Sequence, residues 1–306
     1  MEQVTTTRRV EKLNQASQAR VIDPDRELPG ALGDGAVLAP DLLLPTAGLD
    51  GGVLDPERYA TFSREALAAI TRSGLMFEAV LMAGFGLEIA GTADVTDPRV
   101  TYLLHEVGEE TRHSRLFVRL LDQLGPTAPN PLDNWLTSRV TRRVVDRIVH
   151  HPALLYTMVL AGEEIPDLLQ KRAAEHPATD PFVRAVNRYH RQEEARHLSF
   201  ARGRLAEVWA TASPVDRALV RFAAPTFIRE MYEAMIHPGV FGAVGLPAMR
   251  TWRAARSHPG RVQTRVDATR PVLDVLLDTG ALRRGHVPRP WQRLCLVDAH
   301  GRPAAP

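Results

Sequence analysis

The strongest constraint on the fold is a five-residue motif that occurs twice. The chain reads Glu-Glu-Thr-Arg-His at residues 109–113 and Glu-Glu-Ala-Arg-His at residues 193–197. Each copy holds a Glu-x-x-His unit inside a segment whose apolar residues recur with helical period. Residues three apart share one face of a helix, so two facing helices can each bring a Glu and a His to one point. Helix bundles hold pairs of iron or manganese ions in this way, and the repeat therefore predicts a metalloenzyme.

Turn-forming residues divide the chain into three parts. Residues 1–55 are rich in Gly, Pro and Asp and predict an extended N-terminal arm with little regular structure. Residues 56–282 predict a single all-α, di-metal helical bundle domain. Residues 283–306 lack periodicity and predict a C-terminal tail of loop or terminal strap. The expected helices cover residues 56–72, 74–91, 97–124, 132–149, 151–175, 179–211, 214–237 and 261–280.

Composition argues against several other classes of protein. The formal net charge of +2, without an RNA- or DNA-binding motif, gives no indication of a nucleic-acid partner. The single cysteine, Cys295, rules out an internal disulfide framework and fits a reducing cytoplasm. The polar residues 1–15 do not look like a signal peptide. The longest apolar segment, residues 75–90, is interrupted by Glu78 and Glu88. We therefore expect a core helix there, no membrane partner and a cytoplasmic protein.

The second copy of the motif extends backwards to a third metal-competent side chain. His190 stands four residues before Glu194 and seven before His197, so the three form one stripe on a helix face. Two further acids, Glu78 and Glu163, lie inside apolar stretches. A buried, ionised carboxylate costs several kcal/mol unless it is paired or bound to a metal, so each acid requires a partner. The predicted metal ligands are Glu78, Glu110, His113, Glu163, His190, Glu194 and His197.

Charge and ligand type favour a pair of iron ions at this set. Four carboxylates with neutral imidazoles balance two ferrous ions, and neutrality lowers the cost of burying the site. Mixed nitrogen and oxygen ligands suit iron or manganese better than zinc, which prefers closed four-coordinate sites. Some alternatives stay open, because a single Glu-x-x-His pair can be a surface contact. Glu164 can replace Glu163 as a ligand, and Glu88 and Glu106 are rival carboxylates, with Glu106 expected to be solvated or outside the ring of ligands.

Acids beside the ligands are candidates for orienting them. Glu109 and Glu193 directly precede the ligand glutamate in the two copies. Metal-bound histidines usually donate their second ring N–H to a carboxylate. We therefore predict that each acid orients a histidine on the partner helix. The alternative is a surface ion pair with Arg112 or Arg196.

Other neighbours are candidates for contact with a substrate. Asp167 lies one turn after Glu163 and could contact a cationic or other polar substrate group, or form an outer hydrogen bond. Met82, Phe85 and Tyr156 stand at helical spacing from the ligands. They are candidate walls of a substrate pocket, although aromatic and Met residues at this spacing are also typical of an ordinary core.

On these residues, the chain resembles the di-iron N-oxygenases typified by p-aminobenzoate N-oxygenase. The resemblance covers about residues 60–235 and rests on the ligand order Glu, Glu-x-x-His, Glu, His-x-x-x-Glu-x-x-His, in which His190 is the family's additional histidine. It implies a ferritin-like four-helix bundle core, with additional helices, that holds two iron ions and uses O2 as co-substrate; manganese is the alternative metal. It also implies oxidation of an amine nitrogen to hydroxylamine, nitroso or nitro through a peroxo-diferric intermediate. The expected partners are a small-molecule amine and an external electron donor.

Several other assignments remain open at this point. A di-iron C–H hydroxylase of a small molecule would use the same ligands. A ferritin-like iron-binding or ferroxidase protein would be a short four-helix chain assembling into a shell, and the additional helices argue against it. A manganese catalase or a metal-free structural bundle is a further possibility. We expect a homodimer, because bundles of this size often pair through an outer helix.

Overall fold

The computed structural model describes residues 2–19 and 21–304 and is built from helices. Within this part of the chain there is no strand, only an isolated antiparallel bridge between Val297 and Pro303. The predicted all-α class is therefore confirmed. In chain order the elements are α1 (Glu2–Ala19), α2 (Pro24–Glu27), α3 (Pro40–Ala47), α4 (Pro56–Gly91), α5 (Pro98–Leu124), α6 (Trp135–Val149), α7 (Pro152–Glu175), α8 (Pro181–Ala210), α9 (Pro214–Ala218), the π-helical turn η1 (Leu219–Ala223), α10 (Ala224–Ala234), α11 (Pro238–Ala243), α12 (Ala248–Ala255), α13 (Pro259–Asp278) and α14 (Arg289–Cys295).

Asp-Pro pairs set the starting points of three long helices. The carboxylates of Asp55, Asp97 and Asp180 accept hydrogen bonds from backbone N–H groups in the first turns of α4, α5 and α8. The proline that follows each aspartate supplies a fixed φ and needs no hydrogen-bond acceptor. At its other end, α5 stops at Gly125, whose φ of 56° is left-handed. These signals fix where each helix begins, and hence which face its later residues present.

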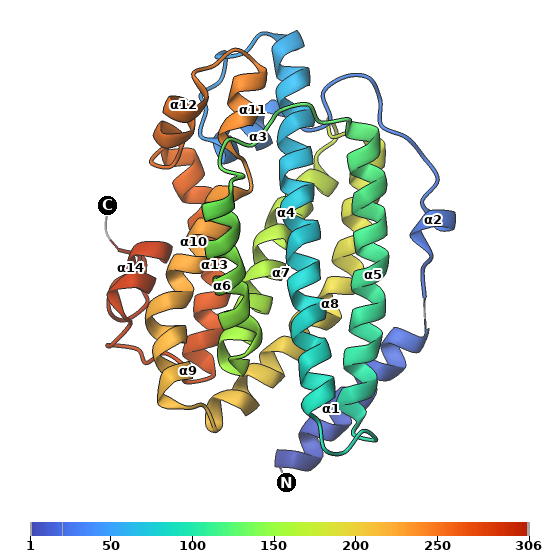
Figure 1. Ribbon diagram of the computed structural model, residues 1–306, viewed down its shortest axis with the longest axis vertical. Coiled ribbons are helices and arrows are strands. Elements are labelled where there is room, and N and C mark those ends of the chain that lie inside the picture. Colours follow the sequence, from blue (N-terminus) through green and yellow to red (C-terminus); the bar gives the residue numbers. More distant parts are fainter. Residues whose placement is uncertain (1, 20, 305–306) are drawn as a thin grey trace.

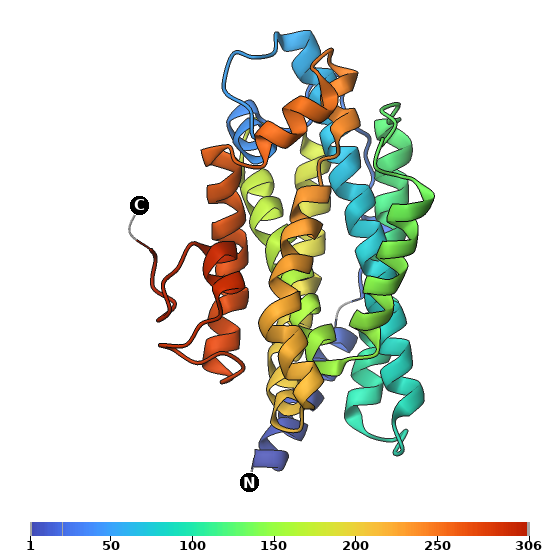
Figure 2. The same ribbon diagram turned by 60° about the vertical axis from the view of Figure 1, so that its left-hand side comes forward.

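Four long helices form the core of the bundle. α4 packs along α5, and α7 packs along α8; all four run roughly along the long axis of the molecule (Figure 1). α6 packs against α4 and α7, while the N-terminal helix α1 packs against α5 and α8 (Figure 1). α13 and α10 cover α7 on the side that Figure 2 brings into view. The arrangement is a four-helix core with additional helices.

The apolar core is divided into two clusters along the bundle. One cluster contains Phe85, Tyr102 and Phe200, and the other contains Phe62 and Leu120. Along α4, α5 and α8, the predicted metal ligands separate the residues of the Phe85 cluster from those of the Phe62 cluster. The polar centre of the bundle is therefore enclosed by apolar layers at both ends.

The N-terminal arm of residues 1–55 contains more helix than the sequence predicts. α1 is polar and lacks a clear apolar stripe, so its residues give no local signal of a helix. It is held by tertiary contacts: Val10 is buried, and the Asn14 amide donates a 2.9 Å hydrogen bond to the carbonyl of Pro98 on α5. Residues 1 and 20 of the predicted arm lie outside the described residues.

The predicted break between helices 56–72 and 74–91 is wrong, because α4 is continuous. Gly74 lies inside it, and a Cβ on this glycine would stand 3.2 Å from the ring of Phe117. The glycine therefore allows a close approach of α5 rather than a turn. The predicted helix 214–237 is instead divided into α9, η1 and α10.

The C-terminal part also departs from the prediction. α11 and α12 were not predicted, and the tail of residues 283–306 contains α14. Trp291 on α14 is buried and its indole donates a 3.0 Å hydrogen bond to the carbonyl of Val220. The tail is therefore packed onto the bundle through this side chain; residues 305 and 306 lie outside the described part.

One described helix, α4, is long and apolar enough to cross a membrane by length and composition alone. The same test is passed by core helices of globular proteins. α4 packs along α5 and carries the buried carboxylate of Glu78 into the bundle. One face of α4 is therefore packed in the bundle, while 22% of its most apolar window is buried.

Candidate metal centre

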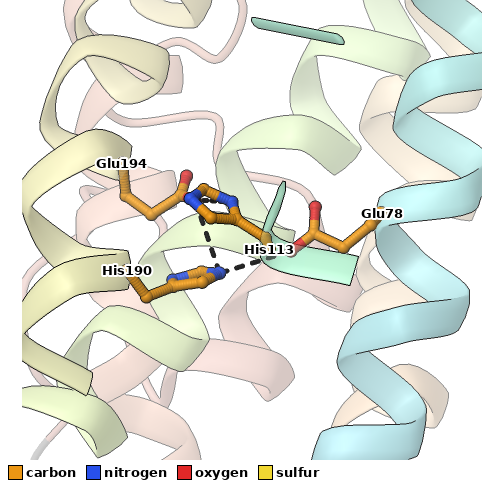
Figure 3. A group of neighbouring side chains, drawn as sticks. All are labelled: Glu78, His113, His190 and Glu194. Carbon is orange, nitrogen blue, oxygen red and sulfur yellow. Dashed lines mark hydrogen bonds and ion pairs between the residues drawn. The ribbon is translucent and has the colours of Figure 1, made fainter. Parts of the chain in front are cut away.

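Seven acidic and histidine side chains converge from α4, α5, α7 and α8 in the middle of the bundle. Each is at most 3% exposed. They form two groups, in each of which one possible ligand atom per residue lies within 4.8 Å of the others, and Glu194 belongs to both. Figure 3 shows the first group facing inwards from α4, α5 and α8. The groups are Glu78, His113, His190 and Glu194, and Glu110, Glu163, Glu194 and His197. All seven predicted ligands are thus brought together.

Glu110 and Glu194 lie between the two groups. His113 Nδ1 is 3.0 Å from Glu110 Oε2 and 3.2 Å from Glu194 Oε1. His197 Nδ1 is 3.0 Å from Glu194 Oε2 and 3.2 Å from Glu110 Oε1. Each carboxylate therefore presents one oxygen to each histidine. This is the placement required of a carboxylate that bridges two ions.

The outer nitrogens of these two histidines are held by the acids that precede the ligand glutamates. His113 Nε2 lies 3.0 Å from Glu193 Oε2, and His197 Nε2 lies 2.8 Å from Glu109 Oε2. Each acid thus contacts the histidine of the facing helix. Each carboxylate accepts a hydrogen bond from the Nε2–H group of the ring. Nδ1 of each ring therefore faces the centre.

Both acids also take part in the ion pairs that the sequence offered as an alternative. Arg112 Nη2 donates to Glu193 Oε1 at 3.1 Å, and Arg196 Nη2 donates to Glu109 Oε1 at 2.9 Å. One oxygen of each acid therefore serves a histidine and the other serves an arginine of the facing helix. These hydrogen bonds connect the motif on α5 to the motif on α8 in both directions.

His190 has a different environment. Its Nδ1 lies 3.1 Å from Gln170 Oε1, and its Nε2 lies 3.3 Å from Glu78 Oε1. An amide oxygen only accepts, so Nδ1 carries the proton and Nε2 faces the centre. The ring of Phe117 stacks on the imidazole at 5.2 Å. Sequence reasoning missed Gln170, although it stands seven residues after Glu163 on the same stripe of α7.

The pKa values of the converging side chains are shifted in different directions. Burial raises the pKa of Glu78 and Glu163 well above the usual range, and the neighbouring carboxylates add to this. Burial alone would lower the pKa of His113, but its bonds to Glu110 and Glu193 raise it to about 9. Burial lowers the pKa of His190 to about 4. A cation bound at this centre would therefore compete with protons for these side chains.

The donor set fits a pair of iron or manganese ions. Glu78 Oε2 and Glu163 Oε1 are buried and accept no hydrogen bond from the described residues. Such oxygens are costly in a protein interior unless a cation or a proton satisfies them. Four carboxylates and three imidazole nitrogens match the ligand preferences of these metals.

The rival carboxylates lie outside both groups. Glu164 pairs with Arg202 at 2.5 Å, and Glu88 pairs with Arg204 at 2.8 Å. Glu106 is 1% exposed, so the expectation of a solvated group is wrong. Burial raises the pKa of Glu106 to about 8, and neither of its oxygens has a hydrogen-bond partner among the described residues.

The proposed substrate contacts are placed as follows. Asp167 pairs with Arg191 Nε at 2.6 Å and belongs to neither ligand group. Phe85 and Tyr156 are buried, with ring centroids 6.4 Å apart. Met82 is partly exposed, and the hydroxyl of Thr111 donates a 3.7 Å hydrogen bond to its sulfur atom. Of these four residues, none belongs to the two ligand groups.

Comparisons with known proteins give two kinds of relationship. The chain is 28% identical over 173 residues to uncharacterized proteins of Mycobacterium tuberculosis (strain ATCC 25618 / H37Rv) and Mycobacterium bovis (strain ATCC BAA-935 / AF2122/97). The matched region is 56% of this chain and 50% of each relative, so the chain spans about half the length of the curated relatives it matches. No solved structure matches it.

The model of one family covers most of the chain. The family described as P-aminobenzoate N-oxygenase AurF matches residues 53–280, which include α4 to α13 and all seven converging side chains. The chain therefore belongs to the p-aminobenzoate N-oxygenase AurF family, a di-iron family with a ferritin-like fold.

Proposed function

We propose that this protein is an O2-dependent di-iron monooxygenase that oxidises the nitrogen of a small-molecule amine to hydroxylamine, and onward to nitroso or nitro. The observation that carries the proposal is the position of His190, whose Nε2 faces the centre beside Glu78. A third histidine is the ligand by which the chain resembles N-oxygenases rather than two-histidine oxidases. Family membership supports the coarser part of the proposal, a di-iron oxygenase.

The seven residues would bind two ions. Glu78, His113 and His190 would hold one ion, Glu163 and His197 the other, and Glu110 and Glu194 would bridge them. When bound, the ions supply the activation of O2. The protein's contribution is to hold the ligands rigidly and to exclude water with the apolar layers at both ends of the centre.

The reaction balances with an external donor. Conversion of R–NH2 and O2 to R–NHOH and water consumes two electrons and two protons. We propose that these electrons come from a separate reductant, and that iron rather than manganese is the metal. We further propose a cytoplasmic homodimer without a nucleic-acid or membrane partner, a state that size-exclusion chromatography with light scattering would test.

A turnover screen tests the function. Iron-loaded protein is incubated with a panel of aryl and alkyl amines, a chemical reductant and ¹⁸O2, and products are analysed by mass spectrometry. We expect ¹⁸O on nitrogen, and loss of this product in Glu163→Ala. Glu164→Ala is the matched control, because Glu164 is the adjacent acid but pairs with Arg202.

Three outcomes would contradict the proposal. Incorporation of ¹⁸O on carbon alone would identify a C–H hydroxylase. Oxidation of iron without oxygen transfer would identify a ferroxidase. Absence of bound iron after anaerobic loading would exclude a di-iron enzyme.

A further inference from the structure

A layer of aromatic side chains lies beside the metal centre, towards the apolar cluster that contains Phe85. The rings of Tyr102 on α5 and Phe200 on α8 have centroids 4.3 Å apart. The rings of Phe200 and Tyr156 on α7 have centroids 6.2 Å apart. Tyr102, Phe200 and Tyr156 are each at most 3% exposed. The three rings therefore form a continuous buried contact across α5, α8 and α7.

The layer lies about one to two helical turns from the second ligand group along each of the three helices. Phe200 stands three residues after His197, which places the two side chains one turn apart on α8. Tyr102 stands eight residues before Glu110 on α5, or about 12 Å along the helix axis. Tyr156 stands seven residues before Glu163 on α7, or about 10 Å. Phe200 is thus the ring nearest to a ligand along the chain, and it packs between Tyr102 and Tyr156.

Tyr156 stands at one end of this layer, and its hydroxyl has a carboxylate as hydrogen-bond acceptor. Its hydroxyl donates a 2.6 Å hydrogen bond to Glu88 Oε2. Arg204 Nε donates to the other oxygen of Glu88 at 2.8 Å. The side chains of Glu88 and Arg204 are 16% and 20% exposed, so this contact reaches the surface of the bundle. A phenol that is wholly buried is thereby connected to solvent through a carboxylate.

The contact has a chemical consequence beyond packing. Burial raises the pKa of Tyr156 well above its usual range, so the phenol keeps its proton in the resting protein. Removal of one electron from a phenol makes its O–H group strongly acidic. The proton then needs an acceptor at hydrogen-bond distance, and Glu88 Oε2 is that acceptor. A tyrosine placed in this way can lose an electron and a proton together without creating a buried charge on its ring.

We propose that Tyr156 is a redox-active residue that passes electrons, across the Phe200 ring, to the oxidised di-iron centre; this inference rests on the proposed function. In the step, Tyr156–OH loses one electron to the oxidised centre and its proton to the Glu88 carboxylate. The products are a neutral Tyr156 phenoxyl radical, a protonated Glu88 and a centre reduced by one electron. The external reductant then returns one electron to the phenoxyl oxygen, and Glu88 returns the proton. Each cycle moves one electron from the reductant to the centre.

A first experiment examines the tyrosine without iron. The metal-free full-length chain is oxidised by photogenerated ruthenium(III) tris-bipyridine, and the phenoxyl radical is followed by its absorbance and electron paramagnetic resonance. We expect a long-lived radical in the wild type and its loss in Tyr156→Phe. Tyr59→Phe is the matched control, because Tyr59 is also buried but its hydroxyl donates to the carbonyl of Leu38. Glu88→Gln, which keeps the shape but cannot take the proton, is expected to reduce the radical yield.

A second experiment examines the direction of electron flow. Iron-loaded, reduced protein is mixed with O2 in the absence of amine and frozen at intervals. We expect a tyrosyl signal in the wild type and in Tyr59→Phe that is lost in Tyr156→Phe. Deuteration of the tyrosine rings should narrow this signal. Thermal unfolding of each variant identifies any that is misfolded, in which case Glu88→Gln carries the comparison.

The outcomes separate this inference from the proposed function. Persistence of the long-lived radical in Tyr156→Phe, in either experiment, would overturn the redox role of Tyr156 and leave the oxygenase unaffected. Formation of the radical in the metal-free chain, with no O2 consumption by the iron-loaded chain, would overturn the oxygenase and with it the destination of the electron. Rapid O2 consumption by wild type without any tyrosyl signal would overturn the electron route alone.

Discussion

The histidines of the centre fall into two kinds, and the contrast between them is the main lesson of the structure. His113 and His197 belong to the repeated motif, face the centre through Nδ1 and are each backed by a carboxylate. His190 faces it through Nε2 and is backed by the neutral amide of Gln170. A carboxylate partner makes an imidazole more basic, whereas an amide only orients it. The repeat thus provides a nearly symmetric pair of strong candidate ligands, and His190 is a third, weaker candidate.

The difference is also visible in the protonation of the metal-free centre. The pKa of His113 is raised to about 9, so this ring binds a proton at neutral pH. Burial lowers the pKa of His190 to about 4, so this ring is neutral. A metal ion must therefore displace a proton at His113 but not at His190. We expect the two kinds of histidine to respond differently to the same substitution.

The largest effect is expected from removal of a carboxylate-backed histidine. His113→Ala should lose most of the bound iron and all turnover, because it also leaves Glu193 Oε2 buried without its hydrogen-bond partner. His190→Ala should keep more iron but lose N-oxygenation. Iron content after anaerobic loading, measured by a colorimetric assay, checks the order. Equal iron loss in the two variants would remove the distinction between the two kinds.

Removal of one supporting carboxylate should have the next largest effect. Glu193→Gln should lower the metal affinity by about 10–100-fold, the usual effect of losing such a partner. Glu109→Gln should behave alike, since its contacts with His197 and Arg196 are equivalent. Competition with a chelator measures both affinities. Glu230→Gln, at an exposed ion pair with Arg256, is the control and should leave the affinity unchanged.

The stability of the protein without metal should depend on pH in part through His113. Because its pKa is raised in the folded state, its contribution is fully present below about pH 6.5 and is lost as the pH rises through about 9. The free energy of unfolding should fall by an amount of order 3 kcal/mol over this window. Urea unfolding at several pH values checks the slope. His113→Gln should reduce this slope without abolishing it, because the pKa values of Glu106 and His197 are also raised, and His190→Gln should leave it unchanged. A smaller slope in His190→Gln together with an unchanged slope in His113→Gln would contradict this assignment.

The smallest effect is expected from the partner of His190. Gln170→Leu should weaken metal binding less than Glu193→Gln does, because only an orienting amide is lost. Gln170→Glu sharpens the comparison, since it gives His190 the kind of partner that the other two histidines have. We expect this variant to recover or exceed the wild-type affinity in the chelator assay. A loss larger than that of Glu193→Gln would show that the amide does more than orient the ring.

The seven converging residues were predictable because each carries its own signal in the sequence. Helical spacing fixes which residues share a face, and an acid inside an apolar stretch requires a partner. The crossed roles of Glu109 and Glu193 were also within reach, because both acids precede a ligand in a repeated motif. Their simultaneous pairing with Arg196 and Arg112 was not, since it depends on how two helices are aligned.

Other features depend on contacts that no local pattern reports. Gln170 is neutral and gives no metal-binding signal, although it lies on the ligand stripe of α7. The ion pair of Asp167 with Arg191 depends on how α7 packs against α8, and no local pattern indicates it. The helical conformation of α1 comes from its packing on α5 and α8, because its own residues are polar. In each case the decisive neighbour is distant in the chain.

The most direct test of the account is a crystal structure of the iron-loaded protein. We expect two ions, one bound by His113 Nδ1 and His190 Nε2, the other by His197 Nδ1, with Glu110 and Glu194 between them. His190 should keep its hydrogen bond to Gln170. A single ion, or two ions with the His190 ring turned away from both, would contradict the central claim.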